Sequence, residues 1–326
     1  MKRVPINKQA VSAWFLRLAQ RGAQMLLTLL GASVLIWIML PLAPGDPALR
    51  TLQALGIENP REAEVQAMRR ELQLDRSLPQ QYVHWLRRAL GGDLSVSWQS
   101  GKPVLQELGK RLPATALLAL VTLLLALLLA LGFALCSAAF PARWPDRVVQ
   151  LLTQLGASLP AFLLGLLLLQ FVVLAAGVGR VVASGTLSDV WLPALCLALG
   201  RAADWAQLLR AGLLDAMQAR FTLVATARGA SKLRLLLRYA LPNALLPLLS
   251  VVGTGIGYLL GGVAIIETVF TWPGLGSYVV SAITARDLPV IQGFVIFSTL
   301  TFVVATLLTD LVSLWIDPRL REVAQG

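Results

Sequence analysis

"LPATALLALVTLLLALLLALGFALCSAAFPA", residues 112 to 142, contains no Asp, Glu, Lys or Arg. About 20 helical residues cross the hydrocarbon core of a bilayer, so this stretch is long enough to span one. Residues 148–179, 239–266 and 288–309 also lack all four charged residues, and residues 23–43 form a further apolar stretch. The sequence therefore predicts a helical membrane protein.

A further span is less cleanly delimited. Residues 190–200 are uncharged, and the span must continue through "RAADWAQLL", which holds Arg201 and Asp204. These two charges are spaced to pair at i,i+3 or to reach the membrane interface. With 57% hydrophobic and 14% charged residues, the chain lies outside the range of ordinary soluble domains. We expect an all-α polytopic protein with six transmembrane helices.

The formal charge of +11 is concentrated in short segments between the apolar stretches, which argues against a nucleic-acid partner. The first 21 residues hold five basic residues and no acid, and residues 210–238 hold six basic residues against Asp215. Under the positive-inside rule, both termini and the basic loops lie in the cytoplasm. An even number of spans agrees with this placement.

Residues 44–111 carry ten basic and eight acidic residues and fall on the outer side. Long loops cross membranes largely regardless of charge. "NPREAEVQAMRRELQL" and "LPQQYVHWLRRAL" have the spacing of amphipathic helices, so we expect a small folded extracytoplasmic subdomain. The predicted organisation is a cytoplasmic segment (1–22), a first transmembrane helix (23–43), the subdomain (44–111), a five-helix core (112–315) with a cytoplasmic loop at about 213–241, and a cytoplasmic tail (316–326).

Catalytic chemistry has few candidates in this sequence. No phosphate-binding G-x-x-x-x-G-K-[ST] loop is present, so ATP-driven transport would need a nucleotide-binding partner. His84, the only histidine, lies in an amphipathic helix pattern, and no metal cluster or serine with a histidine base within the membrane is evident. Cys136 and Cys196 fall in apolar spans, where we expect buried thiols without a disulfide. We expect no enzyme activity, cofactor or metal site in this chain.

Two acids and three glycines are candidates for a role inside the membrane. Glu267 and Asp310 lie near predicted span ends, where a functional role and simple pairing with a nearby base or helix end both remain open. Gly253, Gly257 and Gly261 recur at four-residue intervals, which favours close helix packing. The same face could also serve helix movement, and the sequence does not separate the two roles.

The basic stretch "LVATARGASKLRLLLRYALPNALLP", residues 223 to 247, interrupts the apolar pattern. Its spacing predicts two short helices broken at residues 229–231, with Gly229 as a C-cap and Ser231 as an N-cap. Pro242 fits the first turn of the following span, where its missing N–H costs nothing. Topology alone would account for the charges, but a short basic and leucine-rich surface helix could also dock into a groove of a partner.

These stretches together resemble the membrane subunits of bacterial ATP-binding cassette importers, specifically the peptide and nickel permease family. The family's cytoplasmic signature E-A-A-x3-G-x9-I-x-L-P is matched at Ala225, Gly229, Leu241 and Pro242, while its Glu-Ala and Ile are replaced. "APGDPALR" (43–50), "LQLDRSLPQQYVHWLRRALGGDLSVSW" (72–98), "RLPAT" (111–115), "LGASLPAF" (155–162), "ETVFTWPGLGSYVVSAITARDLPVIQG" (267–293) and "DPRLR" (317–321) look like that family in the expected order.

The resemblance implies the type I importer permease fold in the bacterial inner membrane. It also implies a second, similar permease, two ATP-binding subunits or domains, an extracytoplasmic solute-binding protein, and alternating access between the two permeases. The ATPase would dock on the loop that contains Ala225, Arg228, Gly229, Ser231, Leu241 and Pro242.

Substrate and class leave alternatives open. Nickel, a metal chelate and di- or oligopeptides all fit the resemblance, and "GDPAL", "KPVLQEL" and "SAITARDLPVIQ" look closer to nickel-type members. The rival classes are a self-sufficient secondary transporter or channel, which would work with an ion gradient alone, and a membrane-anchored receptor, which would need no docking loop. A secondary transporter would be expected to have an acidic residue near the centre of a span, and the sequence has none there, which argues against this class.

Overall fold

A computed structural model describes residues 8–39 and 46–316, all of whose regular structure is helical. The chain forms two compact units. The first combines residues up to 111 with residues 278–305, and the second combines residues 112–277 with the segment that begins at residue 306.

The first unit contains the helices of the expected extracytoplasmic subdomain. Its elements are α1 (Lys8–Met39), α2 (Pro47–Ala54), α3 (Glu62–Glu71), α4 (Leu78–Leu90), the first turns of α5 (Val104–Ala139), most of α12 (Leu275–Ala285) and much of α13 (Leu288–Ile316). Helices α3 and α4 confirm the two amphipathic helices predicted from spacing. Helix α2 was not predicted, although Asp46 caps it by accepting a hydrogen bond from the Ala48 N–H at 3.1 Å.

Buried contacts stabilise this first unit. The rings of Trp37 in α1 and Trp85 in α4 lie 5.7 Å apart, and Tyr82 packs against both. Asp287, buried between α12 and α13, accepts hydrogen bonds from the Ser97 hydroxyl and from the Trp98 N–H at 3.1 Å. One carboxylate therefore fixes the loop before α5.

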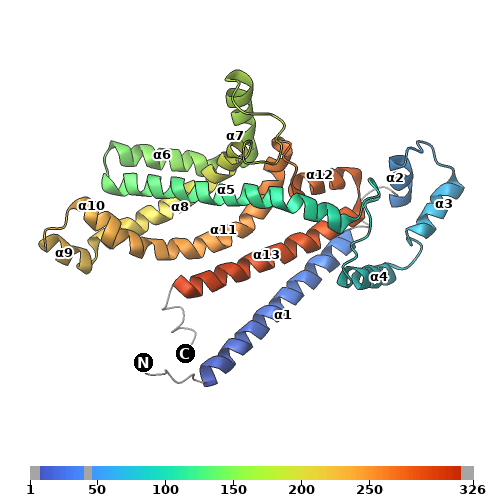
Figure 1. Cartoon of the computed structure of the whole chain (residues 1–326), viewed down its shortest axis with the longest axis horizontal. Helices are drawn as coiled ribbons and strands as arrows, with labels where there is room; N and C mark the ends of the chain where they lie inside the picture. Colours follow the sequence, from blue (N-terminus) through green and yellow to red (C-terminus); the bar gives the residue numbers. More distant parts are fainter. Residues whose placement is uncertain (1–7, 40–45, 317–326) are drawn as a thin grey trace. The chain divides into compact units, whose positions relative to one another are not determined.

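The second unit is a bundle whose long helices run beside one another (Figure 1). Its elements are the rest of α5, α6 (Trp144–Ser158), α7 (Ala161–Leu168), the π-helical segment η2 (Leu169–Ala175), α8 (Trp191–Gln218), α9 (Arg220–Ala227), α10 (Lys232–Arg234), the π-helical segment η3 (Leu235–Ala240) and α11 (Leu241–Val269). Helix α8 is central because it packs against α6, α7 and α11.

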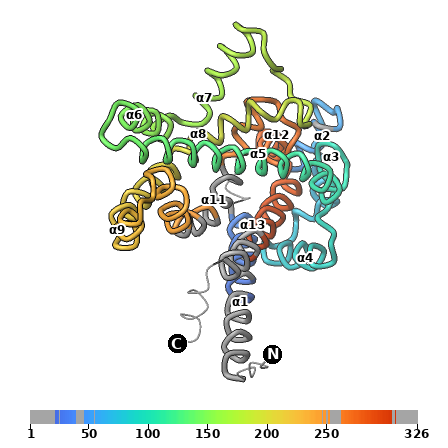
Figure 2. The backbone as a smooth tube through the Cα atoms, turned by 60° about the vertical axis from the view of Figure 1, so that its left-hand side comes forward, coloured from blue at the N-terminus to red at the C-terminus, as the bar shows by residue number. Residues whose placement is uncertain are grey.

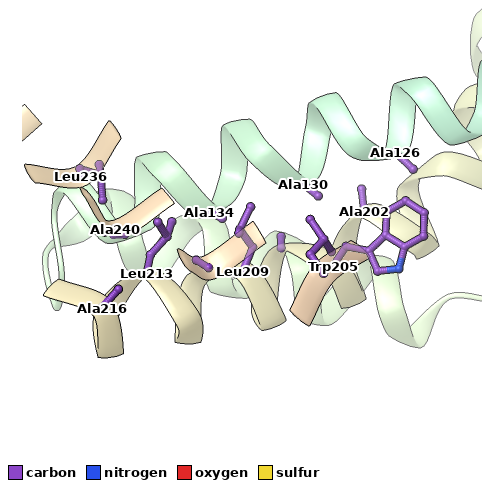
Figure 3. Close-up of a cluster of buried hydrophobic side chains, with 14 of the residues drawn as sticks. Ala126, Ala130, Ala134, Ala202, Trp205, Leu209, Leu213, Ala216, Leu236 and Ala240 are labelled. Atoms are coloured by element: carbon purple, nitrogen blue, oxygen red, sulfur yellow. The ribbon is translucent and has the colours of Figure 1, made fainter. Parts of the chain in front are cut away.

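Small residues are frequent in a buried cluster of this bundle (Figure 3). Ala126, Ala130, Ala134 and Ala138 recur every four residues along α5 and are buried in one cluster with Ala198, Ala202, Trp205, Leu209 and Leu213 of α8. Alanine lets two helix backbones approach closely, which favours packing in lipid, where apolar burial alone gives little drive for association.

The sequence predicted one uninterrupted span over residues 148–179, but the structure breaks this stretch. Helix α6 ends at Ser158, and α7 with η2 continues at an angle of 105° (Figures 1 and 2), so that α7 projects away from α5 and α6. Pro160 is the cause, because it excludes the preceding residue from helical geometry and Leu159 accordingly takes an extended ψ of 125°.

A length and hydropathy test on the described residues gives a smaller span count than the sequence. One helix, α5, is by itself long and apolar enough to cross a membrane, and the bent pair of α6 with α7–η2 would add a second if it counts as one span. The prediction of six transmembrane helices is therefore not confirmed by the structure.

The two thiols differ. Cys196 is buried and its Sγ lies 3.0 Å from the Ala161 carbonyl oxygen, whereas Cys136 is exposed on α5, so the prediction that both are buried was wrong for Cys136. Both thiols are free, as predicted.

A buried carboxylate fixes the turn after α11. Glu267 accepts hydrogen bonds from the Thr115 hydroxyl at 2.7 Å and from the Ser277 N–H at 3.0 Å, and Thr115 in turn accepts from the Leu275 N–H at 2.8 Å. The sequence left two roles open for Glu267, a functional one and pairing with a nearby base or helix end. The structure shows it at a helix end: Glu267 holds the first turn of α12, a helix N-terminus that favours negative charge.

The glycines of this turn are required by space. A Cβ built on Gly274 would overlap the Glu267 carboxylate, and one built on Gly276 would overlap the backbone of Ala264. The Pro273-Gly274-Leu275-Gly276 turn and Glu267 therefore form one tightly packed unit.

Replacing Gly276 with Ala should destabilise the protein by about 2 kcal/mol, because overpacking a tight site forces backbone shifts. Thermal unfolding of the purified protein in detergent would measure the loss. Gly132→Ala is the matched control, since nothing lies within 4 Å of its built Cβ in α5, and an added methyl in a helix is neutral or favourable. Equal melting temperatures for the two variants would contradict this account.

Candidate coupling loop and its anchors

The loop between α8 and α11 begins with the helix α9, which ends in a Schellman motif. Gly229 takes a left-handed φ of +80°, its N–H donates to the Thr226 carbonyl at 2.9 Å, and the Ala230 N–H donates to the Ala225 carbonyl at 3.1 Å. Glycine adopts this conformation without a steric penalty. The predicted helix break at residues 229–231 is present, but the C-cap residue is Arg228 and not Gly229, which follows it.

Ser231 begins the next helix, α10, as predicted, and its backbone is extended with a ψ of 155°. Its side chain makes no capping hydrogen bond, so its contribution is conformational. The following residue, Lys232, donates from Nζ to the Ala139 carbonyl at 2.7 Å. Because Ala139 ends α5, a positive charge meets the negative end of that helix dipole.

Pro242 lies in the first turn of α11, as the sequence predicted. Helix α10 runs through the π-helical segment η3 into α11, so Pro242 follows continuous helix. Proline has no N–H to donate to the preceding turn, and the altered hydrogen-bond pattern of a π-helical segment can accommodate this missing bond. Asn243 helps locally, since its Nδ2 donates to the Tyr239 carbonyl at 2.7 Å.

The loop has one buried and one exposed face. Ala225, Leu235 and Leu236 are buried, and Thr222 ties α9 to the end of α8 by donating to the Ala216 carbonyl at 2.6 Å. On the exposed face, Leu223 and Leu233 are each 63% exposed. The basic residues Arg220, Arg228, Lys232 and Arg234 are exposed on the same loop.

The predicted loop residues divide between these faces. Arg228, Gly229, Ser231 and Pro242 are exposed, Ala225 is buried, and Leu241 packs partly buried against the α5–α8 cluster. Ala225 and Leu241 therefore hold the loop on the bundle, and Arg228 lies at its surface.

A buried ion pair anchors the bundle next to this loop, and sequence reasoning missed it. Arg210 of α8 binds Asp146 of α6 with Nη2 to Oδ2 at 2.8 Å and also donates to the Ser137 hydroxyl of α5 at 2.7 Å. Gln150 and the Ala142 N–H complete the shell around the carboxylate. Asp146 is 1% exposed. Three helices therefore meet at one charge pair whose partners lie 64 residues apart, a separation that hides it from spacing rules.

Replacing Asp146 with Asn should lower the free energy of unfolding by about 3 kcal/mol, because it leaves the Arg210 charge without its counter-ion in a largely buried place. Urea or thermal unfolding in detergent would measure the change. Asp204→Asn is the control, since the Arg201–Asp204 pair is longer at 3.7 Å and more exposed, and such pairs contribute at most about 1 kcal/mol. A similar loss in both variants would contradict the anchoring role.

A small cavity of about 180 Å³ lies where α6 bends into α7 and faces α8. Cys196, Arg201 and Asp204 line it together with Gly156, Gly200 and Gly262. The i,i+3 pairing of Arg201 with Asp204 that the sequence predicted is present. Charged side chains therefore border a cavity between helices of the second unit.

Several other candidates remain untested. Gly253, Gly257 and Gly261 belong to α11, and Asp310 belongs to α13. The surroundings of these four residues lie outside what the structure describes. Among the described residues, no group of three or more His, Cys, Asp or Glu is placed to hold a metal ion.

Comparisons with known proteins agree with this architecture. Residues 128–322 match the family described as binding-protein-dependent transport system inner membrane component. A glutathione transport system permease protein, GsiC, of Pectobacterium atrosepticum is 36% identical over 90% of this chain and 95% of its own length. The probable D,D-dipeptide transport system permease protein DdpB of Escherichia coli is 35% identical over 93% of this chain and 96% of its own.

Solved structures show the fold at lower identity. The chain is similar to the MetNI methionine ABC transporter in its inward-facing conformation, with a TM-score of 0.53 and 17% identity over 65% of this chain and 97% of that one. An amino acid ABC transporter gives a TM-score of 0.50 and 18% identity over 66% of this chain and 94% of that one. The chain belongs to the binding-protein-dependent transport system inner membrane component family: it is a permease subunit and not an enzyme, and ATP is hydrolysed by a partner subunit.

Proposed function

We propose that this chain forms half of the translocation pathway of an ATP-driven importer of short peptides, with a separate ATPase docked on α9 and α10. The observation that carries this proposal is the two-faced loop. Leu223 of α9 and Leu233 of α10 are exposed, whereas Ala225 of α9 and Leu235 of η3, the segment that continues α10, are buried. An apolar patch on a firmly anchored element is typical of a protein interface.

The connections of the loop suit it to transmit movement. Helix α9 is tied to α8 through Thr222, and α10 continues without a break into α11. A partner that displaces the loop would therefore also displace α8 and α11. Both helices contribute lining residues to the cavity between α6 and α8, and they pack against each other. The basic residues around Leu223 and Leu233 favour a partner groove with acidic rims.

Topology follows from charge in this proposal. Six spans place both termini and the loop at about 213–241 in the cytoplasm, since the basic residues concentrate there. The ATPase is cytoplasmic, so it reaches α9 and α10 only in this orientation. The family supports a second permease, two ATP-binding subunits or domains, and an extracytoplasmic solute-binding protein as partners.

Peptides are the proposed substrate class. The similar proteins are named for glutathione, D,D-dipeptides and peptides, so the sequence preference for nickel gains no support from them. Peptide binding also needs no metal-ligating side chains in the permease.

Reconstitution tests the proposal. Liposomes that hold this chain, its partner permease and the ATPase should import labelled dipeptides only when ATP and the binding protein are both supplied. Nickel chloride should not compete for this uptake. Uptake by the chain under an ion gradient alone, without ATP, would instead identify a secondary transporter.

Replacing Leu223 with Asp should reduce coupled uptake at least about fivefold, because truncating or charging an interface anchor costs more than about 1 kcal/mol of binding. The protein should remain folded, since the side chain is exposed. Leu90→Asp, at an 82% exposed position of α4, is the matched control and should leave uptake unchanged. Normal uptake by the Leu223→Asp complex would refute docking at this face.

A further inference from the structure

The turn between α5 and α6 presents two arginines that the coupling mechanism does not use. Arg143 directly precedes α6 and Arg147 lies in its first turn, and both are exposed. The Arg147 N–H donates to the Arg143 carbonyl at 3.1 Å, so the two side chains begin one helical turn apart. Neither guanidinium forms an ion pair with any residue that the structure describes.

A third basic side chain reaches the same turn from the coupling loop. Lys232 donates from Nζ to the Ala139 carbonyl at 2.7 Å, and the Arg143 N–H donates to the next carbonyl, that of Phe140, at 3.1 Å. The start of α10 and the start of α6 therefore meet at the end of α5 (Figure 1). An ammonium group has three donors, so Lys232 keeps two for a further acceptor.

No exposed acid offsets these charges in the two segments that carry them. Asp146 is the only acid between residues 112 and 188, and it is buried and bound to Arg210. Residues 216–266, which include the coupling loop, contain no acid. The three exposed residues Arg143, Arg147 and Lys232, here called the basic turn, therefore concentrate positive charge at one place on the second unit.

An apolar stripe on α6 begins where the basic turn ends. Trp144 is 76% exposed, and Val148, Leu151 and Leu155 are exposed on the same face of the helix. At 1.5 Å per residue, the stripe from Trp144 to Leu155 is about 16 Å long, close to half the hydrocarbon core of about 30 Å. Tryptophan is also enriched at the level of the lipid headgroups. The stripe therefore has the length of the acyl region of one leaflet.

We propose that the basic turn and this stripe form a binding site for an anionic phospholipid of the cytoplasmic leaflet. The phosphate contacts the basic turn, and the acyl chains lie along α6. Arginine binds phosphate oxygens bidentately, and positive charge favours an anionic lipid over a zwitterionic one. The apolar stripe favours a lipid over a soluble phosphate ester. The site rests on the cytoplasmic placement of this turn that is proposed above.

A lipid at this site would join the coupling loop to the bundle. Lys232 belongs to α10, whereas Arg143 and Arg147 flank the start of α6. A phosphate bound by both sides ties the loop to α6, in addition to the bond from Thr222 that ties it to α8. Because the anchored loop transmits the movement of the ATPase, coupled uptake depends on anionic lipid in this proposal.

Native mass spectrometry tests the site on the complex of this chain, its partner permease and the ATPase, released from nanodiscs of phosphatidylglycerol and phosphatidylcholine. The wild type should retain phosphatidylglycerol in preference. Arg143→Gln combined with Arg147→Gln should weaken this retention about fivefold for each arginine removed. Arg70→Gln combined with Arg76→Gln is the matched control, since it removes the same charge from exposed residues of the first unit and should change nothing.

A charge-keeping variant guards against misfolding. Arg143→Lys combined with Arg147→Lys should retain the lipid nearly as well as the wild type. Equal retention by the wild type and the glutamine variant would overturn the site. Release of the lipid by soluble glycerol phosphate at the same phosphate concentration would overturn it in favour of a site for free phosphate esters. Loss of the ATPase from the glutamine variant, with lipid retention unchanged, would assign this surface to the ATPase.

The lipid site and the importer function fail separately. In liposomes of phosphatidylcholine alone, ATP-driven uptake by the wild type should fall at least about threefold relative to liposomes with phosphatidylglycerol, and the glutamine variant should not respond to the lipid. Equal uptake by the wild type in both liposomes would refute the dependence of coupling on the lipid and leave the importer function standing. Retention of phosphatidylglycerol by a complex that imports no peptide under any condition would refute the importer function and leave the site standing.

Discussion

Backbone polar groups in hydrocarbon have no water to bond, so each must find a partner within the protein. This constraint explains why the described regular structure is entirely helical, and it also explains the irregular places. The two π-helical segments keep the chain helical where geometry changes, and the Schellman motif at Gly229 satisfies the carbonyls that α9 leaves unpaired. Where proline removes a donor at Pro160, the chain bends by 105°.

Buried carboxylates satisfy the same demand at the ends of helices. Glu267, Asp146 and Asp287 are each almost fully buried, and each accepts hydrogen bonds from a side-chain hydroxyl and from at least one backbone N–H. A buried charge is costly unless it is bonded in this way. In this chain the acids organise turns and helix junctions, and among them only Asp146 has a basic partner described, Arg210.

Local features were predictable from the sequence and long-range ones were not. The spacing of α3, α4, α9 and α10 and the break at Gly229 could be read directly, because helix periodicity and capping depend on neighbours a few residues apart. The Asp146–Arg210 pair, the Lys232–Ala139 contact and the Glu267–Thr115 contact join residues that the sequence separates widely, so no spacing rule points to them. Pro160 was visible in the sequence, but the uncharged stretch around it dominated the prediction.

The alanine contact between α5 and α8 has a mechanical consequence. Alanine has no side-chain rotamers, so the α5 side of the contact, at Ala126, Ala130 and Ala134, cannot repack when α8 is pushed. Leucine or methionine at the same positions would add side chains that could change rotamers. Any repacking must therefore come from the α8 side, where Trp205, Leu209 and Leu213 have rotamers to change.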